Sequence, residues 1–351
     1  MNRLSYYFFL LLGVLSCNNL HAVSEQQIIG TQAIGASYHF TSDAPVVEQA
    51  KRILAMGSKM IKMSVKENEG GVLDSILAMP FDTYFFWWRS DGAIWENGLS
   101  ESDKAAEYKA TYEFTKKLLT TNPLIKRTYY LGHWEGDWYL INPNNPTEPS
   151  PKRIQGMIDW LNIRQKAVED ARNNVGLNNT LVRVYHYSEV NRVRDAMLHN
   201  KDRVVNKVLP NANVDYVSYS SYDVQQESAE VISETLNYIE DKLPKKEGIT
   251  GRRVFIGECG IQAKAVGYDP EKHEKINRDI FVKFLQAGVP YILYWEMYNN
   301  EVVDGVQEGF WLINDKDEKQ PLYYTLEALY SAQKEFNDIE KQSLSWLKER
   351  K

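Results

Sequence analysis

Two glutamates stand directly after runs of strand-forming residues. Glu258 follows the run 253–257 and precedes Cys259 and Gly260, and Glu135 follows the more aromatic run 128–134. A strand interior offers a charge no water, so an acid there is costly unless the strand ends at a wet cleft. Either glutamate alone fits a surface acid at a strand-to-loop junction equally well. The repetition favours a pair of catalytic carboxyl groups, since barrel enzymes present such groups at strand ends.

Further polar side chains stand near the ends of the other expected strands. Parallel strands of a barrel end at one face, and barrel enzymes build their clefts there. A full ring of polar residues is hard to explain as core packing, so we expect a functional cleft at this face. In chain order, these residues are His39, Lys62, Arg89, His133, Glu135, Asp137, His186, Glu189, Tyr219, Tyr222, Asp223, Glu258, Trp295, Glu296 and Asn299.

Strand-like and helix-like stretches alternate along the chain, which is typical of a parallel α/β arrangement. A doubly wound open sheet usually carries a glycine-rich phosphate loop after its first strand, whereas here that strand is expected to end in Tyr38, His39 and Phe40. The sequence therefore predicts a single-domain α/β fold, a (β/α)8 TIM barrel. The expected strands are 34–40, 59–65, 82–88, 127–134, 181–187, 214–219, 253–258 and 290–295, and the expected helices are 46–56, 73–79, 100–121, 151–173, 190–208, 229–243, 270–287 and 321–335.

The composition is that of an ordinary soluble globular protein, with 43% hydrophobic and 25% charged residues in a chain of 351. The net charge of −6 gives no reason to expect nucleic acid or an anionic membrane surface as a partner. The 9 Trp and 22 Tyr are more informative. Aromatic rings in a cleft suit ligands with flat apolar faces and polar edges, sugars above all, although about half of these rings are expected to fill the core.

The N-terminus has the pattern of a secretion signal, residues 1–22. Arg3 precedes the apolar run 4–15, which is too short to span a bilayer and fits a secretory segment. Cleavage after Ala22 is one expectation. Residues 14–17 also resemble a bacterial lipobox, and Cys17 would then be lipidated and attach the protein to a membrane. Either way the protein is expected outside the cytoplasm, with Cys259 as its one internal thiol. The catalytic barrel is expected over 28–336, followed by a charged helical tail over 337–351.

The two glutamates resemble the catalytic pair of the clan A glycoside hydrolases. Members of this group are (β/α)8 barrels with an acid/base after strand four and a nucleophile after strand seven. The architectural resemblance covers essentially the whole mature chain. In sequence it rests on Glu135, Gly257-Glu258, the strand-six tyrosines Tyr219 and Tyr222, Tyr294-Trp295, and the closing run 309–314 followed by Pro321, Tyr323 and Tyr324.

The resemblance implies a retaining glycosidase without a metal or organic cofactor, acting on a poly- or oligosaccharide. Glu135 would be the acid/base and Glu258 the nucleophile, with carboxyl groups about 5–5.5 Å apart. Tyr219 or Tyr222 would donate a hydrogen bond to the nucleophile. The expected sugar-binding residues are His39, His133, Trp138, His186, Tyr219, Tyr222 and Trp295, and Trp87 or Trp88 would add a stacking platform.

The sequence departs from the clan at one position. Members commonly have an Asn before the acid/base, where it binds the sugar 2-hydroxyl, and Trp134 occupies that place here. His133 or His186 would have to supply the missing hydrogen bond. Glu189 is a rival acid if the strand count slips by one, although its place at the opening of a helix fits capping equally well.

Two other functions remain open. A carbohydrate-binding barrel without hydrolysis would account for the absent Asn. A metal-assisted hydrolase would use His39, His133 and His186, completed by Glu135, Asp137 or Asp223. Against the metal site, the chain has neither a His-x-His pair nor a His-Glu-x-x-His run. Nothing in the sequence indicates an oligomeric state or a sugar and linkage.

Overall fold

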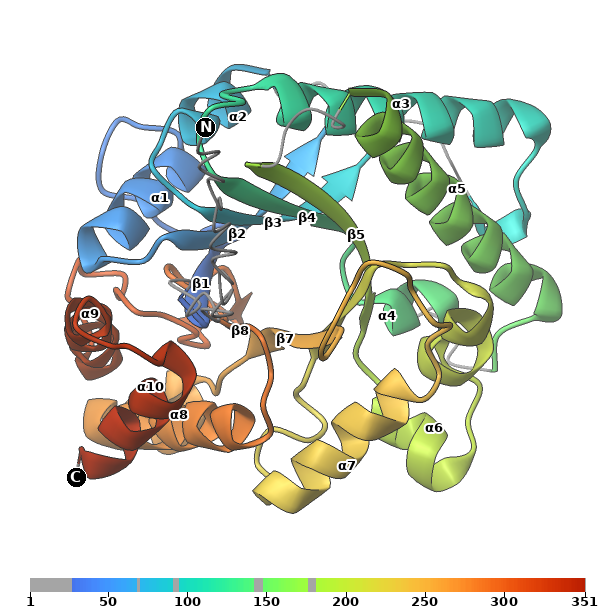
Figure 1. Cartoon of the computed structure of the whole chain (residues 1–351). Coiled ribbons are helices and arrows are strands. Elements are labelled where there is room, and N and C mark those ends of the chain that lie inside the picture. The colour runs from blue at the N-terminus through green and yellow to red at the C-terminus, as the bar shows by residue number, and fades with distance from the viewer. Residues whose placement is uncertain (1–26, 68–69, 91–94, 142–147, 176–180, 351) are drawn as a thin grey trace, which may run out of the picture.

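The structure is a computed structural model that describes residues 27–67, 70–90, 95–141, 148–175 and 181–350. Eight parallel strands form a closed barrel in the order of the chain, with β8 paired to β1 (Figure 1). The predicted single (β/α)8 barrel is therefore confirmed. The strands are β1 Ile29–Ala33, β2 Met60–Lys66, β3 Thr83–Arg89, β4 Arg127–Gly132, β5 Val182–Val190, β6 Tyr216–Ser220, β7 Val254–Cys259 and β8 Ile292–Tyr294.

Helices surround the barrel and connect successive strands. The principal ones are α1 Pro45–Met56, α2 Gly70–Leu77, α3 Glu101–Thr120, α5 Pro151–Val175, α6 Val193–His199, α7 Ala229–Glu240, α8 Pro270–Gln286 and α9 Pro321–Gln333. Short elements lie in the connections: η1 Trp95–Asn97, α4 Gly136–Ile141, η2 Val204–Val208, η3 Leu209–Asn211, η4 Ala263–Val266, and the hairpin strands β9 Val302–Val303 and β10 Val306–Gln307.

The first strand begins five residues before its predicted position, which corrects the expected strand 34–40. The strand is β1 at Ile29–Ala33, and residues 35–40 form a loop. Gly30 permits close packing there, because a Cβ at that position would lie 2.8 Å from the sulfur of Met60. Tyr38 stacks on Tyr298 outside the barrel instead of extending the strand. The sequence 29–33 contains Gly, Thr and Gln, and its weak strand character hid it from pattern analysis.

The predicted helix 190–208 is also corrected. β5 continues to Val190, and α6 ends at Asn200, which has a left-handed backbone with φ 51°. Asn is one of the few residues other than glycine that adopts this conformation readily, and it commonly ends helices. The remaining segment forms the short helices η2 and η3.

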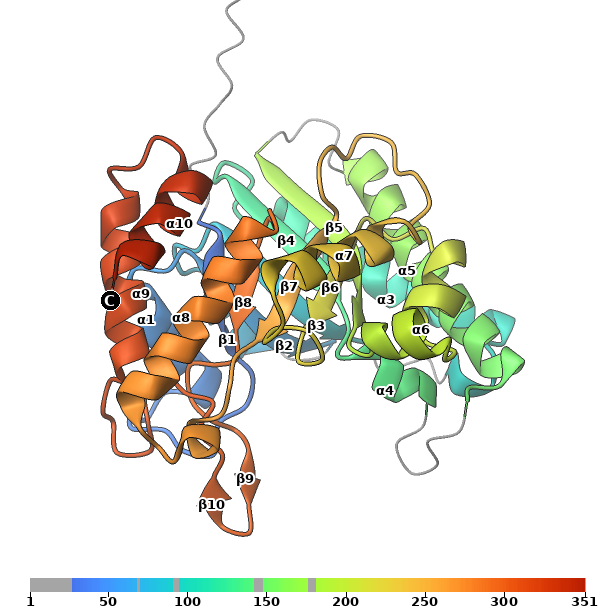
Figure 2. The ribbon, with the colours of Figure 1, turned by 90° about the horizontal axis from the view of Figure 1, so that it is seen from below.

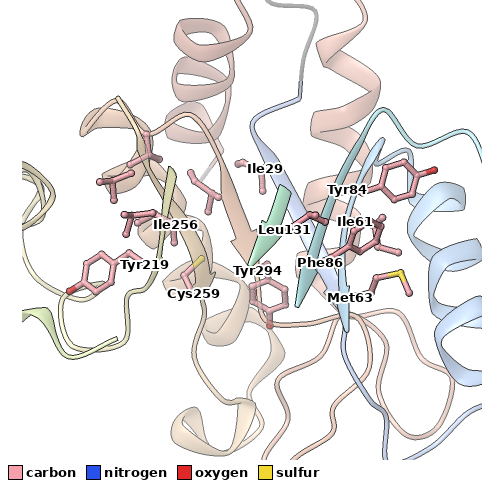
Figure 3. Packing of buried hydrophobic residues seen from close by; sticks show 14 of the residues in the cluster. Ile29, Ile61, Met63, Tyr84, Phe86, Leu131, Tyr219, Ile256, Cys259 and Tyr294 are labelled. Atoms are coloured by element: carbon pink, nitrogen blue, oxygen red, sulfur yellow. The ribbon is translucent and has the colours of Figure 1, made fainter. Parts of the chain in front are cut away.

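Alternating strand residues build two separate hydrophobic clusters. One lies between the strands and the helices and includes Ile61, Phe86 and Leu131 (Figure 3). The other fills the barrel interior and includes Phe85, Tyr130, Phe255, Tyr291 and Leu293. This division follows from the two-residue period of a strand, which directs successive side chains to opposite faces.

Several elements lie outside the eight strand–helix units. The β9–β10 hairpin, which follows β8, and α4, which follows β4, lie at the carboxyl end of the strands, at the bottom of Figure 2. The charged tail forms α10, Ile339–Glu349, which packs on α8 and α9 with Leu347 buried. None of the described helices is long and apolar enough to cross a membrane. The predicted targeting segment 1–22, with Cys17, lies outside the described residues.

Candidate active site

A cavity of about 1190 Å³ opens at the carboxyl end of the strands. Residues that follow several of the barrel strands line it, including Glu135 after β4 and Glu258 in β7. Its walls are rich in indole rings. Of the nine tryptophans of the chain, seven line this cavity: Trp87, Trp88, Trp95, Trp134, Trp138, Trp160 and Trp295.

Glu135 lies in the short turn between β4 and α4. Its backbone N–H donates to Oε1 of Glu189 at 3.0 Å, and its side chain is 8% exposed. The following Gly136 is required by close packing, because a Cβ there would lie 2.6 Å from the carbonyl oxygen of Glu189. The turn that carries Glu135 is thus held against β5 by both backbone and side-chain contacts.

The environment of Glu135 favours its protonated form. Burial, together with the negative charge of Glu189, raises the pKa of Glu135 to about 8, whereas Lys62 and Trp138 act in the opposite direction. A carboxyl group with this pKa holds its proton at neutral pH and can give it to a leaving group.

Glu258 faces the cavity because β7 is irregular at this point. Tyr219 of β6 aligns with Ile256, and the next residue, Ser220, aligns with Glu258, so Gly257 is an extra residue in the ladder. Such bulges change the direction of a side chain and occur often beside active sites. Without the bulge, the alternation of the strand would place Glu258 on the outer face with Ile256.

Two groups contact the Glu258 carboxyl. Lys62 Nζ lies 3.5 Å from Oε1, and the hydroxyl of Tyr222 donates to Oε2 at 3.2 Å. Burial raises the pKa of Glu258, and the charges of Glu189 and Glu135 add to this effect, while Lys62 and Tyr222 oppose it. The Lys62 ammonium and the Tyr222 hydroxyl therefore favour the ionised form of Glu258 against the larger effect of burial.

Lys62 and Glu189 form a fully buried ion pair beneath the cavity, with Nζ 2.9 Å from Oε2. Both residues were expected at strand ends, Glu189 also as a rival acid, but a pairing between them was not predicted. The alternation of the strands could have identified them, since Met60 and Lys62 on β2, and Tyr187 and Glu189 on β5, share the inward parity.

His133 lines the cavity, but both of its ring nitrogens have protein contacts. Nδ1 lies 2.9 Å from the carbonyl of Trp134, and Nε2 accepts from the backbone N–H of Glu189 at 3.3 Å. Burial lowers the pKa of His133 to about 4, so the ring is neutral at pH 7. Its contacts connect the turn after β4 to β5.

The structure does not place His39, His186 or Tyr219 among the residues that line the cavity, which corrects their expected position in one ring. His39 lies in the exposed loop after β1, because that strand ends earlier than predicted. His186 points outward from β5, where Nδ1 lies 3.2 Å from Oε1 of Gln165 on α5. Tyr219 lies in the outer core, and its hydroxyl donates to Asp223.

The other expected sugar-binding residues, Tyr222, Trp138 and Trp295, do line the cavity. The Trp295 ring lies 5.9 Å from that of Trp87, and its Nε1–H donates to Glu301 at 3.2 Å. The guanidinium of Arg192 lies over the Trp138 ring, 5.0 Å from the ring centre. Sequence analysis missed the amide side chains on the cavity wall, which belong to Asn191, Gln262 and Asn300.

The ligands of the alternative metal-assisted site do not converge. Within the described ranges, no group of three or more His, Cys, Asp or Glu side chains is placed to hold a metal ion. Asp137 is instead buried and accepts from the backbone N–H groups of Asn191, Arg192 and Val204. Asp223 accepts from Tyr219 and from the backbone N–H of Arg194. Both acids organise loops.

No protein-family model matches the sequence. No curated protein matches it significantly either. Solved structures of similar fold include a GH2 β-galacturonidase from Eisenbergiella tayi bound to galacturonate, with 14% identity and a TM-score of 0.54. The match covers 88% of this chain but 51% of that one, so the chain spans about half the length of this enzyme.

Two GH5 structures match over nearly their whole length. A family 5 xyloglucanase from Paenibacillus pabuli has 11% identity and a TM-score of 0.54, with 88% of this chain and 99% of that chain covered. A xyloglucan-specific endo-β-1,4-glucanase from a metagenomic library, in complex with cellotriose, has 14% identity and a TM-score of 0.53, with 87% and 97% covered. The chain therefore shares the (β/α)8 fold of GH5 and GH2 glycoside hydrolases.

Proposed function

We propose that the protein is a retaining glycoside hydrolase that acts on poly- or oligosaccharides, with Glu135 as acid/base and Glu258 as nucleophile. One observation carries this proposal: the two carboxyl groups, presented by β4 and β7, line a single tryptophan-rich cavity and have different partners. The fold likeness to glycoside hydrolases supports it, since catalytic groups of barrel enzymes lie at this end of the strands.

The surroundings of the two glutamates divide the roles between them. Glu135, beside the negative Glu189 and with a pKa raised to about 8, holds the proton at neutral pH. Glu258 lies 3.5 Å from the Lys62 ammonium and accepts a hydrogen bond from Tyr222, and both contacts favour its ionised form. Burial raises the pKa of Glu258 as well, so the assignment of the roles rests on these contacts, which Glu135 lacks.

The reaction then follows in two displacements. Glu258 attacks the anomeric carbon while Glu135 protonates the departing glycosidic oxygen, which gives a glycosyl ester on Glu258 and a free alcohol. Glu135, now ionised, takes a proton from water as that water attacks the anomeric carbon. This second step releases the sugar and restores the original protonation of both glutamates.

Aromatic rings and amides around the pair would hold the sugar. Trp295 and Trp87 form adjoining ring surfaces on the cavity wall, and Trp138 lies beside Glu135. Trp134 replaces the asparagine common in the clan, so the hydrogen bond to the sugar must come from elsewhere. We assign it to the amide NH2 of Asn191, which follows β5 and lines the cavity, while its Oδ1 accepts from the backbone N–H of Asp137. Both ring nitrogens of His133 have protein partners, and His186 lies outside.

We also propose that the protein is exported. Arg3 followed by the apolar run 4–15 supports a secretion signal, with cleavage after Ala22 or lipidation of Cys17 as the two possible ends of processing. Mass spectrometry of the mature protein from its native host distinguishes them. An unprocessed N-terminus on an intracellular protein would contradict export.

The test is turnover on a panel of polysaccharides by the wild type, Glu135→Gln and Glu258→Gln, with and without a chelator. We expect products that resist the chelator and disappear in both variants. Binding without products from the wild type would support the carbohydrate-binding barrel instead. Products that the chelator abolishes would support metal-assisted hydrolysis.

A further inference from the structure

Glu189 contacts both halves of the proposed catalytic pair from beneath the cavity. Its Oε1 accepts from the backbone N–H of Glu135 at 3.0 Å. Its Oε2 lies 2.9 Å from Lys62 Nζ, which also lies 3.5 Å from Oε1 of Glu258. One carboxylate therefore touches the chain that carries the acid/base and the cation that contacts the nucleophile.

The Glu189 carboxylate has further hydrogen-bonding partners around it. Ser218 donates to Oε2 of Glu189 at 2.6 Å, and the indole N–H of Trp87 lies within 3.4 Å of the same oxygen. Lys62 donates in addition to the carbonyl of Gly257 at 2.9 Å and lies 4.3 Å from the centre of the Trp87 ring. Groups from five strands, β2, β3, β5, β6 and β7, thus meet at this point, the last through the backbone carbonyl of Gly257.

Gly257 shows how closely the strands approach this pair. A Cβ at this position would lie 1.7 Å from the Ser218 hydroxyl and 3.1 Å from Oε2 of Glu189. No larger residue fits without displacing the hydroxyl that holds Glu189. The glycine before the nucleophile is therefore explained by the Glu189 contacts as well as by the bulge.

Glu189 does not itself act on a substrate in this arrangement. Its side chain is 0% exposed, and it is not part of the cavity wall. A buried carboxylate lowers the stability of the fold unless its charge is paired and hydrogen-bonded. The rival-acid interpretation of Glu189 therefore gives way to another role.

We propose that Glu189 is the positioning residue of the active site, which fixes the turn bearing Glu135 with one oxygen and holds Lys62 against Glu258 with the other. This inference rests on the proposed glycosidase function. It assigns to a single buried carboxylate the geometry of both catalytic groups and the separation of their charges.

The charged and titratable groups that face Glu189 set the expected pH behaviour. They are Lys62 on β2, Glu135 and the neutral His133 after β4, Tyr139 on α4, Glu258 on β7, and the Tyr187 hydroxyl on β5 itself. Neutralising Glu189 removes a negative neighbour from Glu135, so the pKa of Glu135 falls. It also leaves the Lys62 ammonium paired with Glu258 alone, so the pKa of Glu258 falls too. Both limbs of the pH profile then move to lower pH.

Two variants separate the effect of the charge at position 189 from the effect of the side-chain length. Glu189→Gln keeps the side-chain length but removes the charge, and we expect both limbs of kcat/KM to shift to lower pH by about one unit. Glu189→Asp keeps the charge but withdraws the oxygen from the Glu135 N–H, and we expect unchanged limbs with kcat lowered about 100-fold at similar KM. Should Glu189→Gln fail to fold, Glu189→Asp still tests the positioning.

A matched control removes another buried, ion-paired carboxylate far from the cavity. Asp215 is 0% exposed, lies 2.9 Å from Arg172, and accepts from the backbone N–H of His186. Asp215→Asn should lower the thermal midpoint as Glu189→Gln does, but leave both pH limbs in place. Glu189 variants that lose stability yet keep the wild-type limbs and kcat would overturn the proposal.

An infrared titration gives a readout that needs no turnover. The C=O band of the protonated Glu135 carboxyl, identified by its absence in Glu135→Gln, should disappear at a pH about one unit lower in Glu189→Gln than in the wild type. A shifted band without turnover on any glycan would support the positioning role while the glycosidase proposal fails. An unshifted band would overturn the positioning role whatever the activity.

Discussion

Toward the amino end of the barrel interior the inward-facing positions are mostly aromatic, whereas toward the carboxyl end β2 and β5 carry a charged pair there. Phe85 stacks on Tyr130 with ring centroids 4.7 Å apart, and Phe255 lies 5.1 Å from Phe85. One inward position further along β2 and β5, after Met60 and Tyr187 of the same interior cluster, Lys62 and Glu189 are just as deeply buried. On these two strands the apolar and the charged residues follow one alternation.

Burial has a different effect on the stability of the fold in the two layers. Buried rings remove apolar surface from water and stabilise the fold directly. A buried ion pair loses hydration that its mutual attraction only partly restores, and apolar residues of similar volume often replace it without loss. The aromatic layer therefore stabilises the barrel, and under the proposed function the charged layer serves catalysis. Substitutions in the two layers should separate stability from activity.

The largest effect is expected in the charged layer, from Glu258→Gln. Loss of the nucleophile should lower kcat by at least about 10³-fold. The fold should remain, because the amide keeps the size of the side chain and removes a buried charge. Steady-state kinetics together with circular dichroism check this. Turnover within tenfold of the wild type would remove Glu258 from the mechanism.

Phe255→Ala tests the aromatic layer. The ring contacts Phe85, Tyr130, Tyr187 and Tyr291, so its removal leaves a cavity in the barrel interior. We expect the free energy of unfolding to fall by about 3–5 kcal/mol, measured by urea denaturation, with KM unchanged. Phe255→Leu is the milder control, with an expected loss of under about 1.5 kcal/mol. A large change in KM without a loss of stability would contradict the assignment of stability to the aromatic layer.

The pH dependence tests the proton on Glu135. Since the pKa of Glu135 is raised to about 8, the acid form required for catalysis is present below that pH and is lost above it. The value of kcat/KM should therefore fall about tenfold per pH unit above about 8, reaching about 100-fold at pH 10. Glu135→Gln, assayed on an aryl glycoside whose leaving group departs without protonation, should lack this limb, and a limb that survives in the variant belongs to another group.

A smaller effect is expected for the hydroxyl of Tyr222. Tyr222→Phe removes the hydrogen bond to Glu258, and we expect kcat/KM to fall about tenfold. That bond favours ionised Glu258, so its loss raises the pKa of Glu258 and moves the acid limb to higher pH. The control is Tyr130→Phe, whose hydroxyl lies 3.0 Å from that of Tyr291 in the aromatic layer. It should cost about 1 kcal/mol of stability and leave the pH limbs unchanged.

The barrel could be predicted from the sequence because most of its strands are dense in β-branched and aromatic residues. β3, with the sequence TYFFWWR, shows this most clearly, and its predicted and observed bounds differ by one residue. β1 was misplaced because its packing depends on Gly30 and on the side chain of Met60 from the next strand. Such a contact between strands leaves no pattern in the local sequence.

The two glutamates were found because each follows a strong strand, but the ring around them was only partly correct. His186 and Tyr219 have the outward parity of their strands, which chain order alone does not reveal. Glu258 would have failed the same parity test, since only the bulge at Gly257 turns it inward. The role of Glu189 depends on contacts with Lys62, Glu135 and Ser218, which are distant in sequence and meet only in the closed barrel.

The stereochemistry of hydrolysis tests the paired-glutamate mechanism most directly. Proton NMR can follow the anomeric signal of the first-formed product on the best glycan of the panel, before mutarotation mixes the anomers. Attack by Glu258 followed by water predicts that this product has the anomeric configuration of the substrate. An inverted first product would contradict the role of Glu258 as nucleophile and would make it a base that activates water.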